Sequence, residues 1–592
     1  MSELTRRGAE HFAEDFRGSS DPATSETQRA NLWKWIAQKR WPIALLALAI
    51  LALRIVYVLH FRIDSDEPQH LHVVWGWTRG LLPYRDLFDN HAPVFQALCA
   101  PLFWLLGERA DIILPMRLAM LPLFAVTIVC VLRIVVSFAS PRVAVWSAGL
   151  AALYPIYFLN SVEFRPDQLW TAIWMVTLTV LVSGRPTVRR AFLAGVLLGL
   201  SFAVSMKSVL MLAALGSAVL LTFLIGLGIG GMRGRWSGLA KCAAAALAGM
   251  VIVPALVILI FIALGVGREM AYCILQHNIL SGNTSPDSSS KLVLRIVCWL
   301  PVAIGGGIAI GLLKLPAPRR LRLCFSYLAS AFYYIYLVSA WPVLTAEDFL
   351  PFAPAMALWS GPLLLWLYDR GLRALGASHP LTALPLLLCE VAGIFAIQLP
   401  WVDHAQHKIG LVADTLRLTT DRDLVMDSKG ETIYRRRAYY YVLEKMTLAR
   451  IKNGSISNDI IERLIDQRVP LATLRRIPDN AKRFIQQNYV PIAWRLRVLG
   501  QEFPPRNQRP HGPINITVRI PARYTFVTPD GPLPGKLDGV EINGPCDLEE
   551  GPHELTVSPQ ALGKIVMIWS PALERGYSPF APIRPDFTTP QD

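Results

Sequence analysis

Long apolar segments recur along the first two thirds of the chain, and they constrain its fold more than any other feature. Runs of about 20 apolar residues, the length that crosses a bilayer as an α-helix, recur between residues 42 and 399 of the 592. Only 17% of the residues are charged, whereas a soluble protein carries about 25%. We therefore predict a polytopic α-helical membrane protein.

The apolar runs and the polar breaks between them predict eleven membrane-spanning helices. Residues 191–229 are too many for one span, and Met206-Lys207-Ser208 is the only charged break within them. Residues 1–30 lack the apolar centre of a signal peptide, so the first span is expected to direct insertion. The predicted spans are 42–61, 113–136, 143–160, 168–183, 191–206, 208–229, 242–264, 292–313, 323–341, 350–368 and 381–399.

Positive charge predicts the orientation of these spans, because Lys and Arg concentrate in cytoplasmic loops. Thirteen of them lie in one set of alternate short loops and three in the other set. The first set is 137–142, 184–190, 231–241, 314–322 and 369–373, and the second is 161–167, 266–291 and 342–349. The N-terminus is therefore predicted to be cytoplasmic and the C-terminus extracytoplasmic. The same asymmetry accounts for the net charge of +15, so nucleic acid is not predicted as a partner.

The composition changes after residue 400 and predicts a soluble appendage. Residues 400–510 have a mainly helical pattern, and residues 511–592 contain short strands broken by Pro and Gly, which is typical of a small β-rich unit. The predicted domains are a cytoplasmic tail at 1–41, a transmembrane domain at 42–399 with a long first outer loop at 62–112, and an extracytoplasmic α+β appendage in two parts, 400–510 and 511–592.

Three carboxylates follow the first predicted span at once, namely Asp64, Asp66 and Glu67. Acidic groups at a hydrocarbon boundary are costly unless they have a partner or a task. A solvated loop start is the plainer explanation for any one of them, but three together open a loop of a length that is often functional. Within this loop we expect a short amphipathic helix over residues 71–78 and an apolar helix over 94–107 that suits the membrane interface.

Further polar groups fall in loops that are assigned to the same outer side. The segment Glu163-Phe-Arg165-Pro-Asp167 is either a helix cap with proline at the first helical position or part of a site, and both can hold. Lys207 either extends to the interface or balances an anionic headgroup. These positions suggest one outward-facing polar cavity. His70, His72 and His91 match no strong metal-binding spacing, so a metal site is not favoured.

Taken together, these motifs resemble the GT-C superfamily of polyprenyl-phosphate-dependent glycosyltransferases, in particular its family 39/83-like branch, which includes protein O-mannosyltransferases and the lipid A aminoarabinose transferase. The resemblance covers roughly residues 42–400. Its motifs are the Asp66-Glu67 pair, the turn Gly80-Leu-Leu-Pro-Tyr-Arg-Asp86 with Phe88, Asp89 and Pro93 after it, Arg165-Pro-Asp167, Lys207, and Phe349-Leu-Pro-Phe-Ala-Pro354.

The resemblance implies an integral membrane enzyme of the inner or plasma membrane. It would move a sugar, with inversion, from a polyprenyl-phosphate donor to an extracytoplasmic hydroxyl of a lipid, polysaccharide or protein, and no cofactor is predicted. Asp66 would be the general base, and Glu67 would orient the acceptor or share that role. Arg165 and Lys207 would hold the donor phosphate. The expected supporting residues are Glu163, Asp167, Asp86, Asp89 and His91.

Two other classes of protein remain open. A transporter or lipid flippase would also have many spans and charges within the membrane. Transporters, however, usually place their polar groups near the bilayer midplane on broken helices, whereas here the acids cluster at the outer rim. A non-catalytic scaffold, with an appendage that binds a wall polymer or a partner, is the third possibility.

Overall fold

The computed structural model describes residues 25–184, 186–228, 236–278, 303–308, 310, 316–341, 344–374, 383–493, 495–508 and 512–583. Most of the predicted span 292–313, much of the loops 231–241 and 266–291, and the first 24 residues of the predicted tail lie outside these ranges. The chain divides into two compact units, and each is described by itself.

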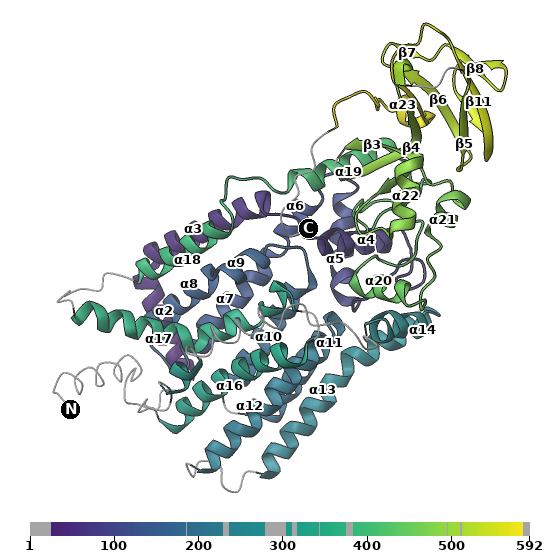
Figure 1. Ribbon diagram of the computed structural model, residues 1–592. Helices are drawn as coiled ribbons and strands as arrows, with labels where there is room; N and C mark the ends of the chain where they lie inside the picture. The colour runs from purple at the N-terminus through teal and green to yellow at the C-terminus, as the bar shows by residue number, and fades with distance from the viewer. Residues whose placement is uncertain are drawn as a thin grey trace. The chain divides into compact units, whose positions relative to one another are not determined.

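The first unit, called here the helical unit, comprises Met1–Phe61, His91–Phe95 and Leu114–Asp403. Figure 1 shows its helices and helical turns. They are α2 (Ser25–Gln38), α3 (Arg40–His60), α6 (Ile113–Leu118), α7 (Leu121–Val135), α8 (Pro141–Leu153), α9 (Pro155–Asn160), α10 (Pro166–Val182), α11 (Val188–Val204), α12 (Ser208–Gly228), α13 (Trp236–Ala263), α14 (Gly267–Ala271), the π-helical turn η1 (Tyr272–Gln276), α16 (Ala317–Ala340), the 3-10 turn η2 (Ala346–Phe349), α17 (Phe352–Ala374) and α18 (Leu384–Ile397).

The predicted polytopic helical fold is confirmed, but the count of eleven spans is not. Among the described residues, five helical segments are long and apolar enough to cross a bilayer. They are Arg40–His60, Ile113–Val135, Ser208–Leu227, Ser237–Ala263 and Arg319–Ala340. Several of the other predicted spans are shorter or interrupted. The run 143–160, for example, is divided into α8 and α9 at Tyr154-Pro155, because proline lacks an N–H and disfavours helix at the residue before it.

Ion pairs connect residues at the ends of these helices, and each pair joins two residues that the charge pattern assigns to the same side of the membrane. Arg142 at the start of α8 pairs with Asp369 near the end of α17 at 3.1 Å, and both residues come from loops of the basic set. Lys207 pairs with Asp167 at 3.1 Å, and both lie in regions assigned to the opposite side. The topology across the membrane itself stays a prediction.

Small residues let α11 and α13 run side by side at very short range (Figure 1). A Cβ atom added at Gly195 would lie 2.0 Å from the carbonyl oxygen of Ala246, and one at Gly249 would lie 2.3 Å from that of Phe192. Backbone atoms can approach so closely in a membrane only where side chains are absent.

Replacing Gly195 by alanine should therefore force the two helices apart. We expect Gly195→Ala to lower the free energy of unfolding by about 1–3 kcal/mol, as overpacking does, measured by thermal unfolding of the detergent-solubilised protein. The matched control is Gly216→Ala in α12, where an added Cβ has no neighbour within 4 Å. Equal effects of both substitutions would contradict the close-packing argument.

The second unit, called here the mixed unit, comprises Arg62–Asn90, Gln96–Ile113 and His404–Asp592. Most of the predicted first outer loop thus packs with the C-terminal region. Its helices are α4 (Asp66–Thr78), most of α5 (Val94–Leu106), α19 (Gln406–Leu418), α20 (Lys445–Lys452), α21 (Ile460–Asp466), α22 (Asp479–Asn488), the 3-10 turn η3 (Arg506–Gln508) and α23 (Ser570–Glu574). The helix expected over residues 71–78 begins five residues earlier and is buried from Glu67 to Gly76, so the amphipathic prediction was wrong.

Two sheets complete the mixed unit, and their strands confirm the predicted β-rich end of the chain. The larger has the order β1-β2-β4-β12-β6-β10, with β3 on β4 and β7 on β6, and the smaller has the order β5-β11-β8-β9. The strands are β1 (Val425–Met426), β2 (Leu471–Thr473), β3 (Tyr489–Ala493), β4 (Leu496–Phe503), β5 (Ile514–Val518), β6 (Ala522–Thr528), β7 (Gly531–Pro532), β8 (Gly535–Leu537), β9 (Val540–Glu541), β10 (Cys546–Leu548), β11 (Gly551–Val557) and β12 (Ile565–Trp569).

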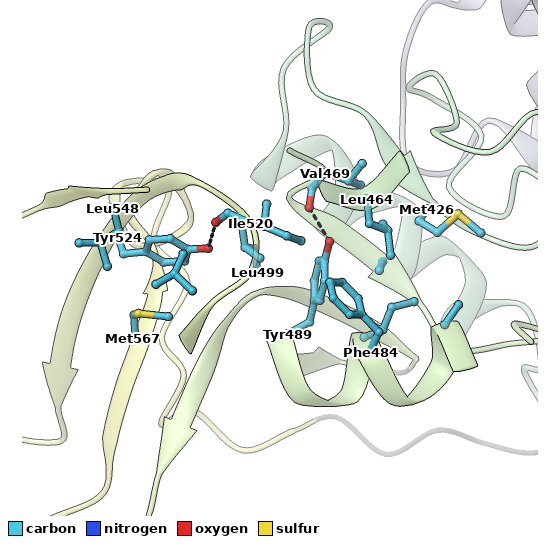
Figure 2. Packing of buried hydrophobic residues seen from close by; sticks show 14 of the residues in the cluster. Met426, Leu464, Val469, Phe484, Tyr489, Leu499, Ile520, Tyr524, Leu548 and Met567 are labelled. Carbon is cyan, nitrogen blue, oxygen red and sulfur yellow. Dashed lines mark hydrogen bonds between the residues drawn. The ribbon is translucent and has the colours of Figure 1, made fainter. Parts of the chain in front are cut away.

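One core crosses the predicted boundary at residue 510. β4 pairs with β12, and buried side chains from Met426 to Met567 form one cluster (Figure 2). Buried tyrosines in this core place their hydroxyls on backbone carbonyls. Tyr489 donates to Val469 at 2.8 Å and Tyr524 donates to Ile520 at 2.7 Å, as Figure 2 shows. The two parts of the appendage share a sheet and a core, and the domain boundaries stay predictions.

A surface His–Asp pair gives the mixed unit a pH dependence. His553 on β11 contacts Asp538 at 2.7 Å. Partial burial opposes the charge on His553, but the hydrogen bond to Asp538 outweighs it and raises the pKa of the imidazole.

This stabilisation is present below about pH 6.5, the ordinary pKa of histidine, and is lost as the pH rises through the raised value. The pair is exposed, so we expect less than about 1 kcal/mol. Thermal unfolding measured from about pH 5 to about pH 9, a range that includes the ordinary value, should show this loss in the wild type and not in His553→Ala. The same slope in both proteins would contradict the assignment.

Candidate functional site

Lys207 is the centre of a buried ionic cluster in the helical unit. It lies between the end of α11 and the start of α12. Its Nζ atom donates to Asp167 Oδ1 at 3.1 Å and also pairs with Asp348. Burial opposes the charge on Lys207, but the carboxylates of Asp167 and Asp348 outweigh this effect, so the pKa of Lys207 lies above its ordinary value. Its ammonium also lies 5.9 Å from the ring centroid of Trp170, within the range of a cation–π contact.

Arg165 joins the same cluster from the start of α10. Arg165 has extended backbone dihedrals and Pro166 occupies the first helical position, so the predicted helix start is present. Its guanidinium donates to Asp167 Oδ2 at 3.2 Å and lies 3.9 Å from Glu347. Asp167 therefore bridges the two cations, Arg165 and Lys207.

The turn η2 supplies two further carboxylates that the sequence reasoning did not select. Thr345 and Asp348 form a reciprocal capping box around η2, and the backbone N–H of Thr345 donates to Asp348 at 2.7 Å. The hydroxyl of Tyr333 donates to the carbonyl oxygen of Asp348 at 2.8 Å. The signal that could have identified them is the adjacent acid pair Glu347-Asp348 in a short predicted outer loop.

The charges of this cluster decide what it can bind. Arg165 and Lys207 face the carboxylates of Asp167, Glu347 and Asp348, so their positive charge is already compensated. An incoming phosphate would have to replace one or more of these carboxylates as their partner. Glu163, expected to support the cluster, is fully buried two residues before Arg165.

Asp66 begins α4 in the mixed unit. Hydrogen bonds between the side chains and backbone N–H groups of neighbouring acids fix this helix start. The backbone N–H of Asp66 donates to Asp64 at 2.9 Å, and that of Asp64 donates to Glu67 at 2.9 Å. Acidic residues in the first turn are also favoured by the helix dipole. Asp64 in turn pairs with Arg62 at 3.2 Å.

We refer to Asp64, Asp66 and Glu67 as the acidic set. Its members differ in how far their side chains are exposed to solvent. The side chain of Asp66 is 23% exposed, whereas Glu67 is 0% exposed. Of this predicted catalytic pair, Asp66 has the solvent access that contact with a substrate requires, and Glu67 holds the helix start.

Lys429 is a partner of Asp66 that the sequence did not indicate. Its ammonium hydrogen-bonds Asp66 Oδ1, and its side chain is 6% exposed. The two residues are 363 positions apart, and no motif surrounds Lys429. A contact at this separation leaves no periodic signal in one sequence.

The predicted supporting residues have structural contacts. Asp89 is buried and accepts from Gln96 at 3.1 Å. Asp86 accepts from the backbone N–H of Leu82 at 2.9 Å and closes the Gly80–Asp86 turn. The hydrogen bond from Arg85 lowers the pKa of Asp86. His91 is half-buried and belongs to the helical unit.

Within the described ranges, no group of three or more His, Cys, Asp or Glu side chains is arranged to hold a metal ion.

Comparison with known proteins identifies the fold. No family model and no curated protein sequence matches the chain. The crystal structure of ArnT from Cupriavidus metallidurans bound to undecaprenyl phosphate matches with a TM-score of 0.54 at 13% identity, over 77% of this chain and 97% of ArnT. The chain has the GT-C fold.

The apo structure of ArnT gives a similar result, with a TM-score of 0.53 at 12% identity over 78% of this chain and 98% of that one. An archaeal oligosaccharyltransferase from Archaeoglobus fulgidus, in its apo form, matches with a TM-score of 0.42 at 11% identity, over 83% of this chain and 74% of that one.

Removing Lys207 should destabilise the helical unit. Lys207→Met would leave Asp167 and Asp348 buried without this cation, and breaking a buried ion pair costs about 3–5 kcal/mol. Thermal unfolding in detergent measures the effect, with the exposed Lys241→Met as the control. Adding Asp348→Asn to Lys207→Met should recover part of the loss, since it removes one uncompensated charge. If the double variant is less stable than the single one, the pairing does not carry the effect.

Proposed function

We propose that this chain is an integral membrane glycosyltransferase that moves a sugar from a polyprenyl-phosphate donor to an extracytoplasmic acceptor. The observation that carries the proposal is the likeness to ArnT over 97% of the length of that protein, in a structure that contains undecaprenyl phosphate. The enzyme would lie in the inner membrane, with the N-terminus cytoplasmic and the C-terminal region extracytoplasmic.

Asp66 is proposed as the general base. A base must reach the acceptor hydroxyl and be ionised before it takes the proton. The partial exposure of Asp66 and its hydrogen bond from Lys429 support this role. Glu67 and Asp64 are assigned to fixing the start of α4, because their hydrogen bonds are made to the backbone there. The reaction is proposed to invert the anomeric centre.

Arg165 and Lys207 are proposed to bind the donor phosphate. Arg offers a planar pair of donors and Lys a compact charge, and both lie at the ends of helices in the helical unit. Asp167 would hold them in place, while the carboxylates of Glu347 and Asp348 would give way to the phosphate.

The test is a transfer assay in proteoliposomes with the full-length protein. The donors are labelled undecaprenyl-phosphate sugars with glucose, mannose, galactose or 4-amino-4-deoxyarabinose, and the acceptors are extracted from membranes that lack this protein. Asp66→Asn should reduce transfer by about 100- to 10,000-fold, the contribution of a general base, and thermal unfolding of the same sample checks that the variant is folded.

The control is Asp547→Asn, the same change at an exposed position on β10, which should transfer at the wild-type rate. Transfer by Asp66→Asn within a few-fold of wild type would remove Asp66 from the role. No transfer by the wild type with any of the donors would contradict the proposed function itself.

A further inference from the structure

The segment that carries Lys429 is fixed by buried hydrogen bonds although it has almost no regular structure. Asp427 is fully buried and accepts from the backbone N–H groups of Gly430 at 2.7 Å and Thr432 at 3.0 Å. Arg437 donates to Asp427 Oδ1 at 2.8 Å and to the carbonyl oxygens of Asp427 and Ser428 at 2.8 and 3.1 Å. We refer to residues 427–437 as the lysine loop. Its centre is therefore held by one buried ion pair.

Two residues of the lysine loop have backbone conformations that are costly for their type. Ile433 has φ 58° and Arg435 has φ 91°, a region that β-branched and long side chains rarely adopt. Such strain persists only where the surroundings impose it. Arg435 is held by the hydroxyl and the carbonyl oxygen of Thr419, at 2.8 and 3.0 Å, and by Glu108 at 3.2 Å.

The lysine loop packs directly on α4. Gly430 has φ 81°, and a Cβ atom there would lie 2.6 Å from the Cβ of His72. Burial lowers the pKa of His72 despite the nearby charge of Asp427. The imidazole is therefore neutral, and its Nδ1–H donates to the carbonyl oxygen of Ile433 at 2.8 Å. His72 lies two turns along the helix that begins at Asp66, so the loop and the predicted base are held by the same helix.

Lys429 balances the repulsion within the acidic set. Asp64 and Asp66 lie two residues apart, and carboxylates so close together oppose one another's ionisation. Arg62 pairs with Asp64 and Lys429 pairs with Asp66. Without Lys429, Asp66 would lose a cation at contact distance, and it would retain a proton at higher pH.

We propose that Lys429, supplied by the C-terminal region, is a positioning residue that keeps Asp66 ionised and oriented as the base for transfer. The inference rests on the proposed function, because it assigns a task to the partner of the proposed base. It makes the C-terminal region part of the catalytic machinery, in addition to any role in recognising the acceptor.

The pH dependence of transfer tests this role. Lys429→Met should move the acidic limb of the rate profile to higher pH by about one unit or more, the effect of losing an opposite charge at contact distance. In the variant, the transfer rate should fall tenfold for each pH unit below the midpoint of this limb. Above that midpoint it should recover towards the wild-type rate. Lys429→Arg should keep the wild-type profile because it keeps the charge. Lys452→Met, at an exposed position of α20, is the control and should also keep it.

A second substitution separates electrostatics from folding. Adding Asp64→Asn to Lys429→Met removes one competing carboxylate while an oxygen acceptor remains for the N–H of Asp66, so the limb should return towards lower pH. If Lys429→Met does not fold, Lys429→Gln is compared with Lys429→Arg in the same way.

The outcomes distinguish the two proposals. A wild-type pH profile in Lys429→Met, or in Lys429→Gln, overturns the inference if Asp66→Asn has abolished transfer. A uniform loss at all pH values that Asp64→Asn does not relieve also overturns it, because that result is structural. Full transfer by Asp66→Asn would instead contradict the proposed base.

Discussion

The contact of Lys207 with two carboxylates is the interaction on which the polar end of the helical unit depends. A lone ammonium or carboxylate in such a place is costly, so Lys207, Asp167 and Asp348 are held where each has an opposite charge. Because these residues come from the start of α10, the break between α11 and α12, and the turn η2, the pairing ties three distant parts of the chain together. Arg165 and Glu347 extend the same network.

The ion pairs of this network also affect how Arg165 and Lys207 would bind a donor phosphate. Both cations already form ion pairs with carboxylates in the absence of a phosphate. A phosphate ligand would replace Glu347 and Asp348 as the partner of these cations. The free energy of binding would then be the difference between the ion pairs that form with the phosphate and the ion pairs that are lost. Such an exchange favours a ligand that brings more than one acceptor oxygen, as a phosphate does.

In the mixed unit the same principle acts on the acids after α3. Asp66 begins α4 between two other acids, and two cations that lie far apart in the sequence, Arg62 and Lys429, pair with Asp64 and Asp66. The lysine loop has a strained backbone and relies on buried partners for its shape. The C-terminal region is thus bound to the first loop by charge, hydrogen bonding and packing on Gly430.

Much of the fold could be predicted because its causes are local. Apolar runs predict helices, Pro166 predicts the start of α10, and the strands after residue 510 follow from short runs between turn residues. Of the proposed site, the sequence identified Asp66, Arg165, Asp167 and Lys207 because acids and bases are rare beside apolar spans. It assigned no role to Glu347, Asp348 or Lys429, and it took the buried helix α4 for an amphipathic one, because packing partners far along the chain decide those features.

By itself, then, the sequence determined that the chain is a polytopic helical membrane protein with a β-rich C-terminal end, and which residues were available for chemistry, since hydropathy and charge act on each segment alone. Only the tertiary structure decided which charges are paired. It placed Lys429 on Asp66, buried Glu67 at the helix start, and joined the first loop to the C-terminal region in one unit. Pairing is decided by distance in space, and residues hundreds of positions apart come together only when the chain has folded.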